Sequence, residues 1–465
     1  MRQLRSFIAL GLALSVSCAN TISGGGDDDG DDTAGDDDGG GDDDGGGDDD
    51  GGGDDDGGGD DDGGGDDDDD GGGDDDGGGD DDGGGGGECS DGLGPWTGND
   101  NVPWSQNPPC GLTASQVPQF VAIGFDDNSY SGLEGSGGTG GFSWAVDMVK
   151  NKHNHDGSPV KLSFYMTTIY ADAWQAESPT FVKRAWHAAA EAGYEIGNHT
   201  FAHADGVAFT AERWRQELED CLDVLARPFN PAEPDQSPDT GVGIGVARDK
   251  VYGFRTPFLG YNDATLATVD ELGFWYDCSI EEGFEYDQDG TNFYWPYTLD
   301  HASPGHDIQL EWPETTKKPI TFHPGLWEMP VYVVIVPPDE ECRKYGVEPG
   351  LRARLKTVQS WFDVEGGKIT GFDYNLWVSF KMTKAEFLAT LKYSLDQRLK
   401  GNRAPFLFGT HTDYYSSKYT APPNASTLQR QQAIEEFIDY ALSKPEVRVV
   451  SAKQVLDWVR NPEPL

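Results

Sequence analysis

Residues 24–87 consist almost entirely of aspartate and glycine, and the unit DDDGGG repeats along them with a period of six. Such a segment has no apolar side chains to bury, and its like charges repel one another. We therefore expect residues 19–87 to be an extended, disordered tether. The repeat lacks the ligand spacing of a calcium-binding loop, which favours a solvated spacer. The globular part lies in residues 88–465, enough for one large α/β domain.

The formal net charge of −50 is concentrated in this tether. Residues 24–87 hold 31 of the 83 acidic residues, which leaves 52 acidic against 33 basic residues and a net charge of −19 elsewhere. A moderately acidic domain argues against nucleic acid as a partner. It is compatible with a neutral or cationic polysaccharide, and we expect the protein to be a monomer.

The N-terminus has the features of an export signal. Arg2 and Arg5 precede an apolar run over residues 7–16, which is too short to span a membrane as a mature helix. The run ends in LSVSC, similar to a bacterial lipoprotein cleavage site at which Cys18 becomes lipidated. We expect residues 1–18 to be this signal, with a lipid anchor at Cys18 as the sole membrane contact. The protein would then lie at the outer membrane or cell surface; an ordinary secretory signal is the alternative.

Export permits disulfide bonds. Cys89 and Cys110 bracket a segment rich in Gly, Pro, Asn and Trp, so a bond between them would staple a short extension at residues 88–117. Three further cysteines follow, and because their number is odd at least one thiol is free: Cys221, Cys278 and Cys342. The sequence does not say which of them pair.

Beyond residue 118, strand-like runs alternate with amphipathic helices. The predicted strands are residues 120–125, 160–168, 194–197, 251–254, 274–280, 406–408 and 447–450. The predicted helices are residues 179–192, 211–226, 263–272, 384–399, 427–442 and 452–459, the first opening at Ser178 as N-cap and closing at Gly193. This alternation predicts an α/β fold with a mainly parallel sheet or barrel. Such folds place their active sites at the carboxyl ends of the strands.

Asp126 and Asp127 come directly after the first predicted strand. Adjacent side chains of an extended segment point apart, so one carboxylate could bind a metal while the other handles a proton. A turn or a helix cap would explain the pair equally well. The pair is therefore weak evidence on its own.

His199 and His203 are four residues apart and follow another predicted strand. In a helix or a tight turn this spacing lets two imidazoles converge on one metal ion. Together with Asp127 they would form a two-histidine, one-carboxylate site with open positions for water and substrate. Arg255 could hold a carboxylate in its ionised form, or form a structural salt bridge. His411 follows a strand and could act as a general acid.

The order of these motifs resembles the polysaccharide deacetylase family, the NodB-homology domains. The motifs are FDD at 125–127, HTFAH at 199–203, RTPF at 255–258 and a strand followed by His411. Other segments are similar to insect-type chitin deacetylases: GFRTPFL at 253–259, YDCS at 276–279, WPYTL at 295–299, LWEMP at 326–330 and WVRNP at 458–462. The resemblance covers residues 118–462. It implies the distorted, incomplete (β/α) barrel of that family.

The resemblance also implies a role for each matched residue. Asp126 matches the catalytic base, Arg255 the residue that tethers it, and His411 the catalytic acid. Asp127, His199 and His203 match the ligands of a divalent ion, zinc or an alternative such as Co²⁺. The remaining positions match groups around the substrate: Pro257 and the Phe258 amide at the oxyanion, and Trp295 and Leu407 at the acetyl methyl.

The sequence departs from the family pattern in three places. Gly124 and Asn128 replace the usual Thr and Gly around the aspartates, and Leu407 lies four residues before His411 instead of two. Insertions at 228–249, 281–294 and 338–372 are expected to form loops around the cleft. Five aromatic residues are candidates for stacking on sugar rings, although ordinary packing would explain each: Tyr286, Phe293, Tyr294, Tyr414 and Tyr415.

The expected function is metal-dependent N-deacetylation of an N-acetylglucosamine polymer, chitin or its oligomers, with release of acetate. Alternatives are a deacetylase of peptidoglycan or of an exopolysaccharide, or an acetyl xylan esterase. A catalytically inactive carbohydrate-binding relative is a third class. Every catalytic position of the family is filled here, which argues against that class.

Overall fold

In a computed structural model of the chain, residues 92–313, 315–420 and 424–465 are described. The expected signal peptide, the anchor at Cys18, the Asp/Gly tether and Cys89 lie outside the described residues. No helix within the described ranges is long and apolar enough to cross a membrane.

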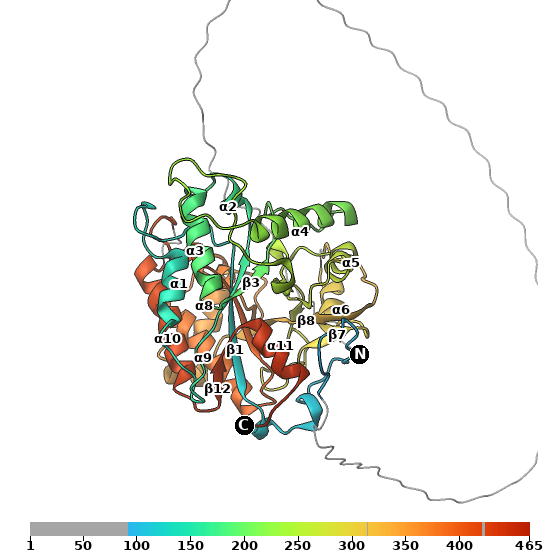
Figure 1. Cartoon of the computed structure of the whole chain (residues 1–465). Helices are drawn as coiled ribbons and strands as arrows, with labels where there is room; N and C mark the ends of the chain where they lie inside the picture. The colour runs from blue at the N-terminus through green and yellow to red at the C-terminus, as the bar shows by residue number, and fades with distance from the viewer. Residues whose placement is uncertain (1–91, 314, 421–423) are drawn as a thin grey trace, which may run out of the picture. The chain divides into compact units, whose positions relative to one another are not determined.

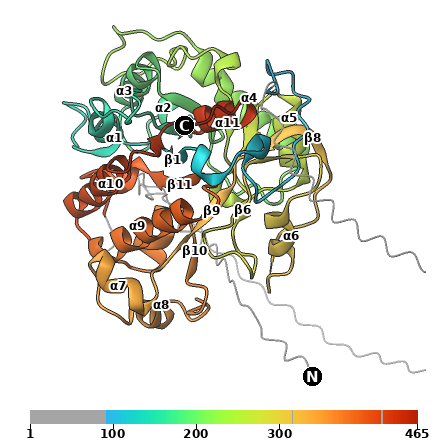
Figure 2. The same ribbon diagram turned by 90° about the horizontal axis from the view of Figure 1, so that it is seen from below.

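The main sheet has nine strands and curls into an incomplete barrel (Figures 1 and 2). The strand order is β11-β1-β2-β3-β4-β5-β8-β7, and β12 pairs with the first residues of β1. All neighbours run parallel except β7 and β8. The strands are β1 Gln119–Asp126, β2 Ser163–Met166, β3 Glu195–Asn198, β4 Gly253–Phe254, β5 Tyr276–Asp277, β7 Tyr297–Leu299, β8 His323–Glu328, β11 Phe406–His411 and β12 Val447–Val449. The predicted α/β fold with an incomplete barrel is confirmed.

A second sheet has three strands in the order β10-β9-β6. They are β6 Glu281–Glu282, β9 Val331–Ile335 and β10 Lys368–Thr370. An isolated parallel bridge between Phe372 and Gly409 links the segment after β10 to β11. Residues 371–373 are thereby brought beside the strand that ends in His411.

In Figure 1, β1 lies near the centre of the folded domain and is flanked on both sides by helices. The helices are α1 Gly141–Val149, α2 Ile169–Asp172, α3 Pro179–Glu191, α4 Ala211–Ala226, α5 Asp263–Glu271, α6 Pro304–Leu310, α7 Asp339–Cys342, α8 Leu351–Val358, α9 Lys384–Lys400, α10 Thr427–Leu442 and α11 Ala452–Arg460. Several begin with the side-chain caps that favour helix initiation; Thr383, for example, accepts from the amide of Glu386 at the start of α9.

The two faces of β1 belong to two separate cores. Val121, Ile123 and Phe125 pack in one cluster with residues of α1, α3 and α10. Phe120 and Ala122 pack in a second cluster, the inner core, with residues of α11 and of β5, β8 and β9. Because side chains alternate along a strand, Gly124 and Asp126 lie on the same face as Phe120 and Ala122. The sequence pattern thus turns Asp126 toward the interior of the barrel.

Helices were predicted more accurately than strands. α4 and α10 have the predicted bounds, whereas the predicted strands at 160–168 and 274–280 shorten to four and two residues. Ser178 is the N-cap residue of α3 as predicted, but its hydroxyl makes no capping hydrogen bond and donates instead to the carbonyl of Asp235. Gly193 follows the helix with a φ of +72°, as a helix-ending glycine requires.

The insertions differ from the predicted loops. Residues 228–249 contain just a short 3₁₀ turn at their end, but 281–294 contain β6 and 338–372 contain α7, α8 and β10. Apolar residues such as Leu351 and Leu355 are buried in the first core and hold the last insertion in place. The prediction of a loop is therefore wrong for residues 338–372. The thiols of Cys221, Cys278 and Cys342 are all buried and unpaired.

Candidate active site

Asp126 is the last residue of β1, and the chain turns sharply after it. Asp127 and Asn128 have φ angles of +64° and +69°, which non-glycine residues rarely adopt. Asn128 is fully buried, and its amide donates to the carbonyls of Phe125 and Tyr165, both at 3.0 Å. An asparagine in place of the usual glycine therefore holds the turn that separates the two carboxylates.

His199 directly follows β3, and the segment to His203 forms a tight turn. The Thr200 amide donates to Oδ1 of Asn198 at 2.9 Å, and the His203 amide to Oγ1 of Thr200 at 3.1 Å. Glu217 of α4 supports the turn from outside, because its Oε2 accepts from the Ala202 amide at 2.9 Å. The predicted convergence of the two imidazoles thus arises in a turn and not in a helix.

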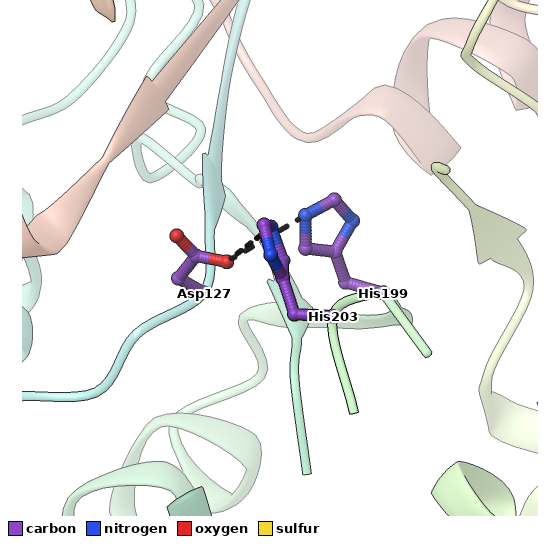
Figure 3. A group of neighbouring side chains, drawn as sticks. All are labelled: Asp127, His199 and His203. Atoms are coloured by element: carbon purple, nitrogen blue, oxygen red, sulfur yellow. Dashed lines mark ion pairs between the residues drawn. The ribbon is translucent and has the colours of Figure 1, made fainter. Parts of the chain in front are cut away.

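Asp127, His199 and His203 bring one ligand atom each within 4.8 Å of one another (Figure 3). Oδ1 of Asp127 lies 3.0 Å from Nε2 of His203 and 3.7 Å from Nε2 of His199. Among the described residues, this is the sole group of three such side chains with that geometry. We call it the metal triad.

The chemistry of the triad fits a divalent ion. Nδ1 of His199 is 2.8 Å from the carbonyl of Arg255, so this nitrogen carries the proton and Nε2 offers its lone pair. Oδ1 of Asp127 is buried and makes no hydrogen bond, although Nε2 of His203 lies 3.0 Å away. A buried carboxylate oxygen without a partner is costly, and a cation would satisfy it. Two imidazoles and one carboxylate suit zinc and similar metals.

Asp126 is held apart from the triad by Arg255. Nη1 of Arg255 donates to Oδ1 of Asp126 at 2.8 Å, and both side chains are buried. The other carboxylate oxygen, Oδ2, is directed toward the triad, 4.0 Å from Nε2 of His199. Burial alone would lower the pKa of Arg255, but the Asp126 carboxylate raises it above its usual value. Arg255 therefore stays charged and leaves one oxygen of Asp126 facing the triad.

His411 ends β11 and pairs in register with Asp126 of β1. Its Nδ1 lies 2.7 Å from Oδ1 of Asp373, and its amide donates to Oδ2 of the same carboxylate at 3.1 Å. Thr410 and Tyr415 also donate to Asp373, at 2.6 and 3.2 Å. Asp373 thus fixes the imidazole and leaves Nε2 of His411 as the nitrogen free of this contact.

The three histidines titrate differently. Burial lowers the pKa of His199 to about 4 despite the nearby aspartates. Burial also opposes protonation of His411, but the charge and hydrogen bond of Asp373 raise its pKa to about 9. For His203, Asp127 outweighs burial and raises the pKa. The pKa of Asp127 is held well below its usual value, since the histidines outweigh its burial.

Backbone strain gathers in the same place. Ten non-glycine residues of the described part have positive φ angles, and six of them border this site: Asp127, Asn128, Thr200, His203, Phe258 and Leu259. Such conformations cost free energy and persist where the surrounding structure enforces them, often at functional sites. The strain thus marks the same site as the side chains do.

Pro257 and Phe258 lie beside the triad in a short turn, Pro257–Leu259. The Phe258 ring is 53% exposed and meets the His203 ring edge-on, with 4.7 Å between centroids. Trp295 and Leu407 are buried in the inner core. The ring centroid of Phe372 lies 5.9 Å from that of His411. The oxyanion and acetyl-pocket roles remain predictions.

The five candidate stacking residues divide by exposure. Tyr286 is 85% exposed, and Tyr294 is half-buried. Phe293 and Tyr415 are wholly buried, and Tyr414 nearly so. Phe293 stacks on Tyr332 inside the protein, and Tyr415 donates to Asp373. Sugar stacking by Phe293 and Tyr415 is therefore wrong.

Sequence reasoning missed Asp373, Glu217 and the function of Asn128. Asp373 lies 38 residues before His411 and belongs to no motif; the bridge between Phe372 and Gly409 brings it there. In the sequence, Glu217 is one of several acidic residues of a predicted amphipathic helix, and nothing there distinguishes it from the others. For Asn128, the departure from glycine directly after two aspartates was the available signal.

Several solved structures are similar to this chain, two of them over about three quarters of its length, although no known family profile matches it. One is from Mycobacterium smegmatis and is assigned as a polysaccharide deacetylase: TM-score 0.44, 17% identity, 77% of this chain and 95% of that chain. The other, from Pseudomonas aeruginosa and similarly assigned, has a TM-score of 0.38 and 15% identity over 74% of this chain and 92% of that chain.

A curated relative matches a large part of the sequence. Chitin deacetylase 8 of Bombyx mori is 22% identical over 369 residues, which cover 78% of this chain and 75% of that protein. The resemblance indicated by the motifs is confirmed: the chain is a homologue of a chitin deacetylase.

Proposed function

We propose that this protein is a metal-dependent deacetylase of N-acetylglucosamine polymers, with chitin or chito-oligosaccharides as substrate and acetate as product. The observation that carries the proposal is the division of labour between two adjacent aspartates. Asp127 lies with His199 and His203, whereas Asp126 is bonded to Arg255 and keeps one oxygen toward the triad. The similarity to a chitin deacetylase supports the substrate class.

Asp127, His199 and His203 would hold the ion, for which we propose zinc. When bound, the ion supplies Lewis-acid polarisation of the acetyl carbonyl and of the attacking water. Asp126 acts as general base: it accepts a proton from water as the water oxygen bonds to the acetamide carbon. Arg255 orients Asp126 through the hydrogen bond from Nη1 to Oδ1.

His411 acts as general acid at the other side of the reacting group. Asp373 accepts from Nδ1–H and its charge raises the pKa of His411 to about 9, so the protonated ring also carries a proton on Nε2. That proton passes to the leaving nitrogen as the carbon–nitrogen bond breaks. The products are acetate and a free amine on the sugar. The backbone amide of Phe258 is proposed to stabilise the oxyanion that develops on the carbonyl.

The test is acetate release from N-acetylated chito-oligosaccharides by the full chain, measured after chelation and after zinc is restored. We expect release that is lost with chelator and regained with zinc. Asp127→Asn is the matched variant, because it keeps the shape of the side chain and removes the charged ligand. Retained oligosaccharide binding without acetate release in added zinc would identify an inactive carbohydrate-binding protein and contradict the proposal.

A further inference from the structure

Two aromatic rings contact the guanidinium of Arg255. The Tyr165 ring of β2 lies under it at 4.4 Å from the guanidinium carbon to the ring centroid, and the Phe372 ring at 5.2 Å. Tyr165 is fully buried and Phe372 nearly so. Buried cation–π contacts of this kind are stronger than exposed ones, because water does not compete for the cation.

The strands leave room for the Tyr165 ring at two glycines. A Cβ at Gly124 of β1 would lie 2.9 Å from the Tyr165 ring and 3.1 Å from Nη1 of Arg255. A Cβ at Gly197 of β3 would lie 2.5 Å from the same ring. At both positions a Cβ would lie less than 3.0 Å from the Tyr165 ring, so the ring could not stay in place beside a side chain. Gly124, where the family has threonine, therefore leaves the space that the Tyr165 ring and the Arg255 guanidinium occupy.

Hydrogen bonds fix the far edge of the Tyr165 ring. Its hydroxyl lies 2.9 Å from the hydroxyl of Tyr276, which donates to Oε1 of Glu195 at 2.6 Å. Oε2 of Glu195 accepts from Ser163 and from the Lys453 amide in the first turn of α11. The ring is thus anchored at both sides, by packing at the glycines and by this network.

We propose that Tyr165 and Phe372 are positioning residues that act through Arg255: they hold the guanidinium where Nη1 meets Oδ1 of Asp126. This rests on the proposed function, in which Asp126 is the base. Arg255 also donates through Nε to the carbonyl of Cys278 at 3.1 Å. The N–H donors of Arg255 bond within the plane of the guanidinium, so the flat faces of the group remain available for the two rings. A planar guanidinium can make both kinds of contact at once, whereas an ammonium cannot.

Phe164 offers a matched control on the same strand. It is as fully buried as Tyr165, but the alternation along β2 directs it to the other core, where it packs on Phe125 and Phe142. If the Tyr165 ring does no more than fill space, leucine at either position should have the same consequences. A positioning role predicts that they differ.

The experiment compares Tyr165→Leu, Tyr165→Phe and Phe164→Leu in the full chain with zinc. We expect Tyr165→Leu to lower kcat about tenfold with KM within about twofold, the order of one desolvated cation–π contact. Tyr165→Phe keeps the ring and should restore kcat to within about twofold. Phe164→Leu should lower Tm to a similar extent and leave kcat unchanged.

A double-mutant cycle with Arg255→Lys separates positioning from general damage. If Tyr165 acts through Arg255, adding Tyr165→Leu to Arg255→Lys should change kcat less than about twofold further. A full tenfold loss in both backgrounds would overturn the proposal. So would an equal kcat loss in Phe164→Leu.

A readout independent of activity keeps this test distinct from that of the proposed function. The Nε–H proton of Arg255, observed by NMR with labelled arginine, should be protected from exchange in wild type, Tyr165→Phe and Phe164→Leu, and lose that protection in Tyr165→Leu. Unchanged protection in Tyr165→Leu would overturn the positioning role. A wild type with this protected signal but no acetate release would instead contradict the proposed function.

Discussion

The metal triad and the pair formed by His411 and Asp373 lie at the same end of one sheet, yet the pKa of a histidine is shifted in opposite directions in the two places. Both His199 and His411 are removed from water, which disfavours the imidazolium in each. His199 nevertheless has its pKa lowered to about 4, and His411 has its pKa raised to about 9.

The difference arises from the group that faces Nδ1. For His199 it is the neutral carbonyl of Arg255 at 2.8 Å, and for His411 it is the carboxylate of Asp373 at 2.7 Å. A neutral imidazole has a lone pair to give to a metal, whereas a protonated one has a proton to give to a leaving group. Burial thus disfavours the charged form of both imidazoles. The group that faces Nδ1 then decides whether the ring is neutral, as a metal ligand must be, or protonated, as a general acid must be.

The largest expected effect is loss of the triad. His203→Ala or removal of the metal should lower kcat by at least about 1,000-fold, since Lewis-acid polarisation contributes several kcal/mol to transition-state stabilisation. The check is acetate release together with zinc affinity by calorimetry. Full activity of His203→Ala would show that the triad is not required for catalysis.

Asp373→Asn should have the next largest effect. In the proposed mechanism His411 acts in its protonated form, and Asp373 holds its pKa at about 9, so wild-type kcat should fall as the pH rises through about 9. Without the carboxylate the pKa of His411 drops, so this fall should move to lower pH and kcat at neutral pH should decrease about tenfold or more. An unchanged alkaline limb in the pH profile would show that His411 is not the acid. Zinc affinity should be unaffected in this variant.

Gly124→Ala tests the packing beneath Asp126. The new methyl group would collide with Tyr165 and Arg255, so we expect kcat to fall about tenfold and the free energy of unfolding to fall by about 1–3 kcal/mol. Chemical denaturation and acetate release measure both quantities. Normal kcat in a folded Gly124→Ala protein would show that the guanidinium can move without cost.

Thr410→Val should have the smallest effect. It removes one of the donors to Asp373 while the His411 contact remains. Loss of one buried hydrogen bond predicts a decrease of about 1 kcal/mol in the free energy of unfolding. We expect kcat to change by less than about threefold, because the contact between Asp373 and Nδ1 of His411 is retained. A large shift of the pH profile would mean that Thr410, and not Asp373 alone, sets the pKa of His411.

The triad could be predicted from the sequence because its residues are local signals: two aspartates after a strand and two histidines four apart. α4 could be predicted because its apolar residues recur at helical spacing behind Thr210, whose hydroxyl accepts from the Arg213 amide. Asp373 could not be predicted, because no motif in the neighbouring sequence distinguishes it. A single bridge, between Phe372 and Gly409, brings it beside His411. The two-residue strands β4 and β5 are likewise set by their neighbours in the sheet, since so short a run carries no periodicity of its own.

The central claim is that Asp126 and Asp127 do different work, and paired measurements on Asp126→Asn and Asp127→Asn test it most directly. For each variant, zinc affinity and acetate release from chito-oligosaccharides are measured on the same preparation. The account predicts that Asp126→Asn binds zinc as the wild type does and loses about 100-fold or more in kcat, whereas Asp127→Asn loses zinc binding itself. Full turnover by Asp126→Asn, or equal loss of zinc by both variants, would contradict it.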